Sequence, residues 1–189
     1  STLSSSSAAS DVYKRQQSPP SPRFCPQCAT PLREVTLDED GGAKARLRCT
    51  ACGWTHWNNP TPVLAAVIEY RGQVLLARNA AWTGRQFALI TGFMEAGETA
   101  EQGIAREIRE ETNLETQSLD LLGVWSFERM NQIIIAYHAV ADGEIRLSPE
   151  LVEYKLFDLD RVKCWPAGTG QALAQWLRSR GHEPEFTEF

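Results

Sequence analysis

The 189-residue chain lacks several features that would have set its class at once. No apolar run approaches the ~20 residues of a membrane-spanning helix, and no charged segment followed by an apolar one marks a secretory signal. The net charge is −5, so the chain has no overall positive field for a nucleic-acid backbone. These absences lead us to expect a cytoplasmic protein with no membrane partner.

Cysteine is also scarce, and four of the five cysteines form two CxxC pairs, Cys25 with Cys28 and Cys49 with Cys52. Each pair makes a tight turn that can direct two thiolates at one ion, and two such turns complete a tetrahedron. The pattern predicts a zinc ribbon with a closed, structural Zn²⁺ site in a reducing compartment. His56 is not expected to be a ligand, because four thiolates already fill the coordination sphere.

Composition divides the chain into four segments. Residues 1–23 are rich in Ser, Ala and Pro and are predicted to be disordered; the ribbon is expected over 24–60, a larger domain over 61–182 and a C-terminal tail over 183–189. In the larger domain, apolar runs predict strands and a closing helix. The strands are expected at 63–68, 74–77, 87–90, 119–127, 133–140 and 154–157, with a hairpin turn at 141–143 and the helix at 168–179. This order favours an α/β fold in which a mixed sheet is sandwiched between helices.

The most informative stretch runs from Gly92 to Leu114 and reads GFMEAGETAEQGIAREIREETNL. Thr99 with Gln102 makes a capping box just after Gly97, and Asn113 is suited to the left-handed residue that often ends a helix. At about 100° per residue from Ile104, Glu111 lies near −20°, Glu107 near −60° and Glu110 near −120°. The glutamates therefore lie beside the apolar edge rather than opposite it.

Three carboxylates so close together repel one another unless a cation lies between them. Carboxylate oxygens are hard ligands, and they suit Mg²⁺ or Mn²⁺. A solvated acidic helix is the alternative, but such a helix would carry its charges opposite the apolar edge.

The whole pattern of Gly92, Glu98, Arg106-Glu107, Glu110-Glu111 and Asn113-Leu114 resembles the Nudix box, with Asn113 where the family has glycine. The resemblance implies a Nudix fold and hydrolysis of a diphosphate linkage. It implies that Glu107 and Glu111 bind divalent cations, that Glu110 is a ligand or the base, and that the Thr91 carbonyl completes one ion's shell. Gly92, Gly97, Glu98 and Arg106 would hold the turn against the helix. Glu150, with Glu153 as the alternative, would be a further acid.

The order of ribbon and domain, with the stretch PAGTGQAL, further resembles the NADH pyrophosphatases of the Nudix family. That family's Gln-Pro-Trp-Pro-Phe-Pro run is replaced by residues 125–132, so the FAD and ADP-ribose pyrophosphatases with a ribbon remain alternatives. The resemblance implies substrate contacts at Trp57, Trp125 and Phe127, a nucleotide substrate, capped RNA as a further candidate, and a homodimer.

A different class of function is a non-catalytic module, in which the Nudix fold senses a nucleotide and the ribbon contacts nucleic acid or protein. The ribbon has balanced charges, whereas binding a phosphate backbone requires a positive surface. Together with the intact glutamate set, this balance favours an enzyme.

Overall fold

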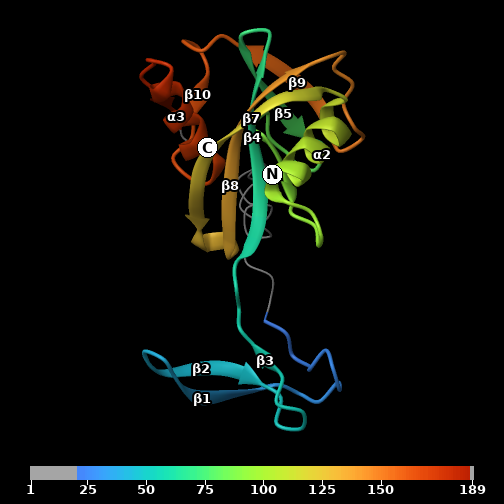
Figure 1. Ribbon diagram of the computed structural model, residues 1–189, viewed down its shortest axis with the longest axis vertical. Helices are drawn as coiled ribbons and strands as arrows, with labels where there is room; N and C mark the ends of the chain where they lie inside the picture. Colours follow the sequence, from blue (N-terminus) through green and yellow to red (C-terminus); the bar gives the residue numbers. More distant parts are fainter. Residues whose placement is uncertain (1–20, 188–189) are drawn as a thin grey trace, which may run out of the picture. The chain divides into compact units, whose positions relative to one another are not determined.

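The computed structural model describes residues 21–187, which form two compact units (Figure 1). The predicted disorder of residues 1–23 falls almost entirely outside the described residues. The smaller unit ends at Pro60, and the described residues from Thr61 onward belong to the larger unit.

The smaller unit is a three-stranded antiparallel sheet in the order β1 (Arg33–Glu39), β2 (Gly42–Arg48) and β3 (Thr55–His56). Cys25 and Cys49 are buried, while Cys28 and Cys52 are exposed. Few apolar side chains are buried here, so apolar burial alone gives the unit little stability.

The larger unit is built on a six-stranded sheet whose long path runs β7-β8-β4-β5-β9, with β6 paired to the remaining part of β4. The strands are β4 (Thr61–Tyr70), β5 (Gln73–Asn79), β6 (Ile90–Phe93), β7 (Glu115–Phe127), β8 (Gln132–Asp142) and β9 (Leu151–Phe157). A short 3₁₀ turn, η1 (Glu128–Met130), joins β7 to β8. Strands β4 and β8 are parallel and the other pairs are antiparallel, so the predicted mixed sheet is confirmed.

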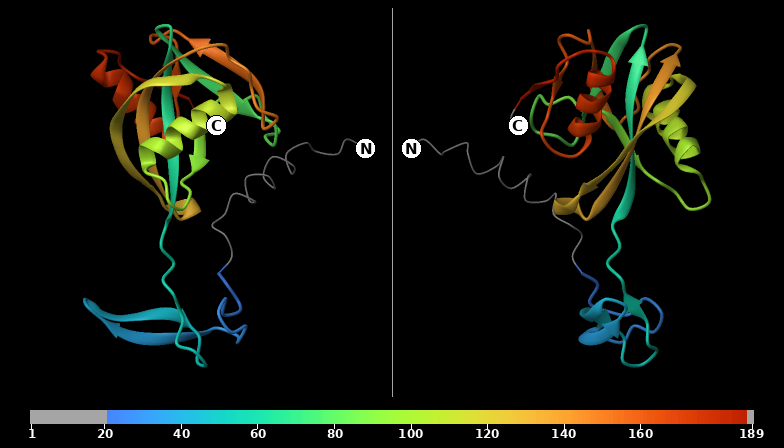
Figure 2. Two further views of the ribbon diagram at one scale, coloured as in Figure 1. Left: turned by 45° about the vertical axis from the view of Figure 1, so that its right-hand side comes forward. Right: turned by 60° about the vertical axis from the view of Figure 1, so that its left-hand side comes forward.

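Two helices cover opposite faces of this sheet (Figures 1 and 2). Alternating residues of β4 explain the arrangement, because successive side chains of a strand point to opposite faces. Leu64, Ala66 and Ile68 pack with Ile104 and Ile108 of α2 (Ala100–Thr112). Ala65 and Val67 belong to the clusters that contain α3 (Thr169–Ser179), the predicted closing helix.

Two predicted elements differ in the structure. The apolar run 87–90 is not a strand throughout, because Ala88 makes only an isolated bridge to Ala77 and regular pairing begins at Ile90. Its apolar character reflects burial against the α3 side of the core. The turn at 141–143 does not form a hairpin, because β8 pairs with β4 and β7 whereas β9 pairs with β5. Residues 143–150 instead form a loop along the end of α2.

The C-terminal segment is also ordered as far as the structure describes it. Strand β11 (Glu185–Phe186) pairs in parallel with β10 (Lys163–Cys164). The N–H of Thr187 donates to the carbonyl of Cys164 at 2.9 Å, and Lys163 pairs with Glu185 at 3.4 Å. Part of the expected tail is therefore attached to the larger unit.

Candidate metal and nucleotide site

Helix α2 presents the glutamates, and its ends are fixed by the predicted signals. The Thr99 hydroxyl accepts from the N–H of Gln102 at 3.2 Å, and the Gln102 amide oxygen accepts from the N–H of Thr99 at 2.9 Å. Asn113 ends the helix in the left-handed conformation, with φ of 62°. Since both caps are local, the sequence alone sets the start and the end of the helix.

The Glu107 carboxyl lies directly against the backbone of Gly92 in β6. A Cβ atom added to Gly92 would overlap this carboxyl group. Gly92 pairs with Leu64, whose side chain faces α2, so the same face of β6 is turned toward the helix. Glycine is required here by close approach, which allows the helix to set a carboxylate on the strand.

Arg106 connects the turn to the helix. Its guanidinium donates to both oxygens of Glu98, at 3.0 and 3.1 Å, and to the carbonyl of Phe93 at 3.3 Å. It also donates to Glu107 at 2.8 Å and to Glu110 at 3.1 Å. The Arg106 guanidinium holds the pKa of Glu98 below its ordinary value. The resemblance indicated only the contact with Glu98; the i,i+4 spacing of Arg106 and Glu110 was the available signal for the second contact.

Glu111 differs from its neighbours because no basic side chain within residues 21–187 pairs with it. Burial, together with the negative charges of Glu107, Glu150 and Glu110, raises its pKa to about 7. Burial also raises the pKa of Glu107, against the opposing effect of Arg106. A half-buried carboxylate surrounded by carboxylates is destabilised unless a cation compensates it.

The loop 143–150 places a fourth carboxylate beside Glu111. The N–H groups of Arg146 and Ser148 donate to the last helical carbonyls, those of Thr112 and Glu111, at 2.9 and 3.0 Å. Glu150 follows directly, and its charge acts on Glu111.

Glu153, the alternative acid, is engaged elsewhere. It lies 3.4 Å from Arg78 and 3.9 Å from Lys155. The geometry therefore favours Glu150 over Glu153 as a partner of Glu111.

Strand geometry leaves the Thr91 carbonyl available. The N–H of Met94 donates to the carbonyl of Pro62, which fixes Leu64 and Gly92 as the next hydrogen-bonded pair of this antiparallel ladder. Thr91 belongs to the alternate, non-bonded pair, so its carbonyl points away from β4.

The carboxylates of Glu107, Glu110 and Glu150 act electrostatically on Glu111, and among the described residues only Arg106 pairs with any of these four groups. Hard oxygen donors with this excess of negative charge suit a divalent cation. Within residues 21–187, the cysteines are the one set of three or more ligands whose atoms all lie within 4.8 Å of one another. The glutamates are thus not closed around a single point, and Arg106 holds two of them.

The four cysteines match a tetrahedral zinc site. Their sulfur atoms are separated by 3.5 Å for Cys25 and Cys52, 3.4 Å for Cys28 and Cys49, and 3.6 Å for Cys28 and Cys52. A tetrahedron with Zn–S bonds near 2.3 Å has edges of about 3.8 Å. The backbone N–H of Cys52 lowers the pKa of Cys49 to about 6, which favours the thiolate form that binds metal.

The aromatic residues predicted to contact substrate lie in two places. Trp125 and Phe127 pack on Ala65 and Ala172, on the α3 face of the sheet. Trp57 belongs to the ribbon unit, is 54% exposed and has the Arg46 guanidinium 5.5 Å from its ring centre. Trp125 and Phe127 are therefore not on the face that carries Glu107, and any role for the three aromatic residues remains a prediction.

A mixed sheet between two helices, with a carboxylate cluster where a glycine turn meets a helix, defines an α/β protein of the kind that presents acidic ligands to divalent cations. A NUDIX domain model matches residues 59–178, and a Nudix N-terminal zinc-ribbon model matches residues 23–58. The chain belongs to the Nudix family.

Individual relatives agree with this assignment. The chain is 29% identical over 157 residues to a NAD-capped RNA hydrolase NudC of Stutzerimonas stutzeri, covering 82% of this chain and 54% of the relative. A Pseudomonas aeruginosa protein with the same description is 28% identical, over 77% of this chain and 51% of its own. The chain thus spans about half the length of these curated relatives.

Among solved structures, a NUDIX hydrolase from Nitrosomonas europaea has a TM-score of 0.71 and 28% identity, covering 88% of this chain and 97% of its own. An ADP-ribose pyrophosphatase from Streptococcus suis, with a TM-score of 0.54 and 18% identity, covers 68% of this chain and all of its own. The latter likeness concerns the fold alone. Along the part of the chain described here, neither helix is long and apolar enough to cross a membrane.

Proposed function

We propose that this chain is a divalent-cation-dependent pyrophosphatase that hydrolyses the diphosphate linkage of a dinucleotide or a nucleoside diphosphate derivative such as NAD(H). The observation that carries this proposal is Glu111, a half-buried carboxylate next to Glu107, Glu110 and Glu150 without a basic partner among the described residues. Such a cluster is costly to maintain, and neutralising a bound cation's charge is the function that accounts for it.

Glu107, Glu111 and Glu150, with the Thr91 carbonyl, would hold Mg²⁺ or Mn²⁺. The bound cation would neutralise the diphosphate oxygens and lower the pKa of a coordinated water. Glu110 is the most exposed carboxylate of the helix set, and we assign it as a ligand or as the base that takes the proton from the attacking water. Glu98 would act through Arg106, which also bonds to Phe93 of β6, the strand that carries Thr91 and Gly92.

Several diphosphate compounds are candidate substrates for this reaction. The absence of the Gln-Pro-Trp-Pro-Phe-Pro run favours activity on several diphosphates, with FAD and ADP-ribose as alternatives to NAD(H). The descriptions of the curated relatives also make NAD-capped RNA a candidate. The ribbon would bind structural Zn²⁺, and a homodimer is the assembly that we propose to test by light scattering.

The decisive experiment measures hydrolysis of NADH, NAD, FAD and ADP-ribose by the purified chain with Mg²⁺ or Mn²⁺, with Glu111→Gln as the matched inactive variant. We expect cation-dependent cleavage of at least one substrate, with the two phosphates divided between the products. If none is cleaved with either cation while a nucleotide still binds, the proposal is wrong and a non-catalytic module becomes the better interpretation.

A further inference from the structure

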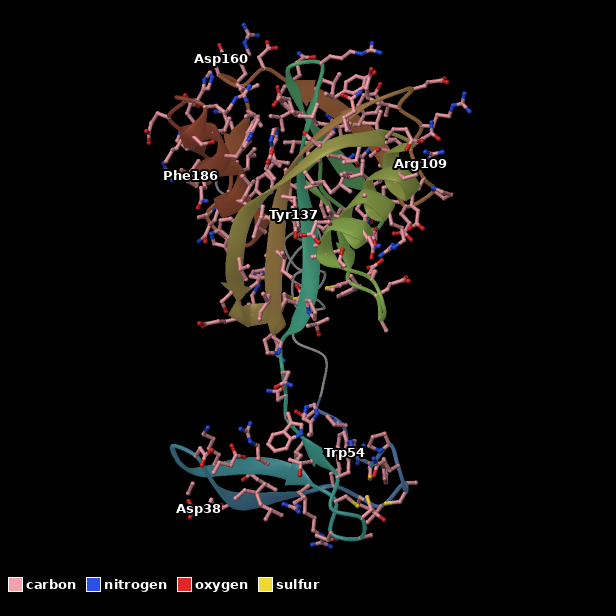
Figure 3. The ribbon with its side chains drawn as sticks, in the orientation of Figure 1. Asp38, Trp54, Arg109, Tyr137, Asp160 and Phe186 are labelled. Carbon is pink, nitrogen blue, oxygen red and sulfur yellow. The ribbon has the colours of Figure 1, made fainter. Side chains whose placement is uncertain are left out.

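An open hollow of about 530 Å³ lies on the α3 side of the larger unit, and the glutamates do not contribute to it. Its wall combines aromatic, amide and cationic side chains with smaller apolar ones. The lining residues are Trp125, Pro166, Gln171, Ala174, Gln175, Arg178 and Phe186. In Figure 3, Phe186 lies beside α3, on the other side of the sheet from Arg109 of α2.

Two aromatic rings reach this hollow from segments far apart in the sequence. Trp125 comes from β7 and is half-buried against the core. Phe186 comes from β11, where pairing with Cys164 fixes the backbone while the side chain stays 51% exposed. A large apolar ring held on an ordered strand and left open to solvent provides a stacking surface at little further cost in entropy.

The polar groups of the hollow add charge and hydrogen-bond direction. Arg178 is exposed on α3, and no carboxylate within residues 21–187 forms an ion pair with it. The side-chain N–H groups of Gln175 and Gln171 donate to the carbonyls of Leu122 and Pro166, at 2.8 and 3.2 Å. Each amide uses one of its two N–H groups in this bond, so its carbonyl oxygen and its second N–H group are left for a ligand.

A ligand that satisfies all these groups has a planar ring, an anionic group and a hydrogen-bond donor on the ring edge. Any nucleobase can stack on aromatic side chains, and a phosphate pairs with a guanidinium that has no other ionic partner. An exocyclic amino group would donate to the amide oxygens, whereas a carbonyl at the same position would leave these oxygens without a donor and could bond only to a remaining amide N–H.

A row of paired residues connects this hollow with the carboxylate cluster. Trp125 pairs with Ile134, Ile134 with Val63, and Val63 with Phe93, so these four side chains lie on the same α3 face. Three inter-strand steps of about 4.8 Å separate Phe93 from Trp125 by roughly 14 Å. Gly92, which contacts the Glu107 carboxyl, directly precedes Phe93. The row therefore ends beside Gly92, on the opposite face of β6 from the Glu107 carboxyl.

We infer that the hollow binds one nucleoside monophosphate half of a dinucleotide substrate, with a base that carries an exocyclic amino group, such as adenine. The base stacks on Trp125 and Phe186, its amino group donates to the glutamine amides, and its phosphate pairs with Arg178. This inference deepens the proposed function and rests on it, because it takes the second half of the dinucleotide to reach the carboxylates.

The test measures binding without turnover. AMP, UMP, adenosine and ribose 5-phosphate are titrated into the Glu111→Gln chain by calorimetry, with no Mg²⁺ or Mn²⁺ added. We expect saturable binding of AMP, about tenfold weaker binding of UMP, and losses of about tenfold or more for adenosine and for ribose 5-phosphate.

Variants assign that binding to the hollow. In the same background, Arg178→Gln and Phe186→Leu should each weaken AMP binding by about fivefold or more, on the scale of a lost ion pair or stacking contact. Arg161→Gln, an exposed arginine outside the hollow, is the matched control and should leave AMP binding unchanged. Chemical shifts of the Thr187 amide would show whether Phe186→Leu detaches β11, and Arg178→Gln does not depend on that segment.

With Glu111 intact, Arg178→Gln should raise KM for NADH while kcat stays within about twofold. The inference is overturned if AMP does not saturate, or if both hollow variants bind it as tightly as the control. Since no cleavage is involved in the binding test, either result leaves the carboxylate assignment standing; loss of hydrolysis with AMP binding intact would reject the proposed function instead.

Discussion

The carboxyl group of Glu107 occupies the space in which a side chain of Gly92 would lie. The centre of the site is therefore a close contact between helix α2 and strand β6. This contact is possible because residue 92 is a glycine and has no side chain. The position of Glu107 is set by the backbone of β6 and by one bond from Arg106. Both partners are rigid, which is the condition for a ligand that keeps its place before the cation arrives.

Replacing Gly92 with alanine is expected to displace Glu107 and reduce kcat by about 10²-fold or more, on the scale of a misplaced catalytic group. The fold should survive, because the carboxylate can swing toward solvent. Gly84→Ala is the control, since a Cβ there meets only Gln86 atoms at an ordinary 3.6 Å. Equal activity of the two variants would show that Glu107 does not act from its present position.

Glu111→Gln is expected to lower turnover by about 10³-fold, as for loss of a key transition-state contact. The same change should raise the melting temperature of the protein without Mg²⁺ or Mn²⁺, because it removes a desolvated charge from among like charges. The pKa of Glu111 is raised on folding from 4.5 to about 7, so the wild type loses stability as the pH rises from about 4.5 through about 7. The gain from glutamine should therefore shrink as the pH falls from 8 to 5.

Arg109→Ala controls for general damage to helix α2. Arg109 pairs with Glu115 and is more than half exposed, and its loss should leave turnover near the wild-type value. Wild-type turnover of Glu111→Gln at saturating Mg²⁺ and Mn²⁺ would refute the metal assignment.

The pair Glu150 and Glu153 offers a matched comparison within one segment. Glu150→Gln should weaken Mn²⁺ binding and lower kcat by about 10- to 100-fold, because its charge acts on the Glu111 site. Glu153→Gln removes only surface ion pairs with Arg78 and Lys155, a loss of ~1 kcal/mol or less. Mn²⁺ titration followed by electron paramagnetic resonance reports affinity directly, and the reverse ranking would transfer the role to Glu153.

Removal of zinc should unfold the ribbon and leave the larger unit largely intact, because metal binding and folding are one process in a unit with so small a core. Cys25→Ser and Cys49→Ser should act as a chelator does. Metal analysis should find one zinc per chain, and amide spectra should show loss of the 24–57 signals alone. A ribbon that stays folded without zinc contradicts the prediction.

Substrate selectivity should be modest, because the Gln-Pro-Trp-Pro-Phe-Pro run is absent. We expect kcat/KM for NADH to exceed that for ADP-ribose by less than about a hundredfold, or roughly 2.7 kcal/mol. Steady-state kinetics with both substrates and the same cation measure this ratio of kcat/KM values. A larger ratio would mean that another surface performs the missing recognition.

Local signals in the sequence predicted the parts of the fold that depend on neighbouring residues. Thr99, Gln102 and Asn113 each act within one helical turn, so the bounds of α2 followed from them. The apolar face of α3 was equally clear, and Leu173, Trp176 and Leu177 are all buried. The CxxC pairs predicted the cysteine cluster because each turn is local and two such turns can share one metal ion.

Features that depend on contacts between residues far apart in the sequence could not be predicted from such local signals. Strand β7 has irregular register near Thr116 and Leu121, which breaks the alternation of side chains between faces. The hollow needs Phe186 of the last strand beside Trp125, and nothing near either residue indicates the other. The path of residues 143–150 was missed for the same reason, since a turn signal marks a change of direction but not its destination.

The loop 143–150 limits which changes in chain length the site can accept. Its N–H groups terminate α2 at the carbonyls of Glu111 and Thr112, and its last residue is Glu150. One inserted or deleted residue would thus uncap the helix and move an acidic side chain away from Glu111 in a single step. Surface loops usually tolerate changes in length, whereas the length of this one is constrained by its bonds to the end of α2 and by the position of Glu150.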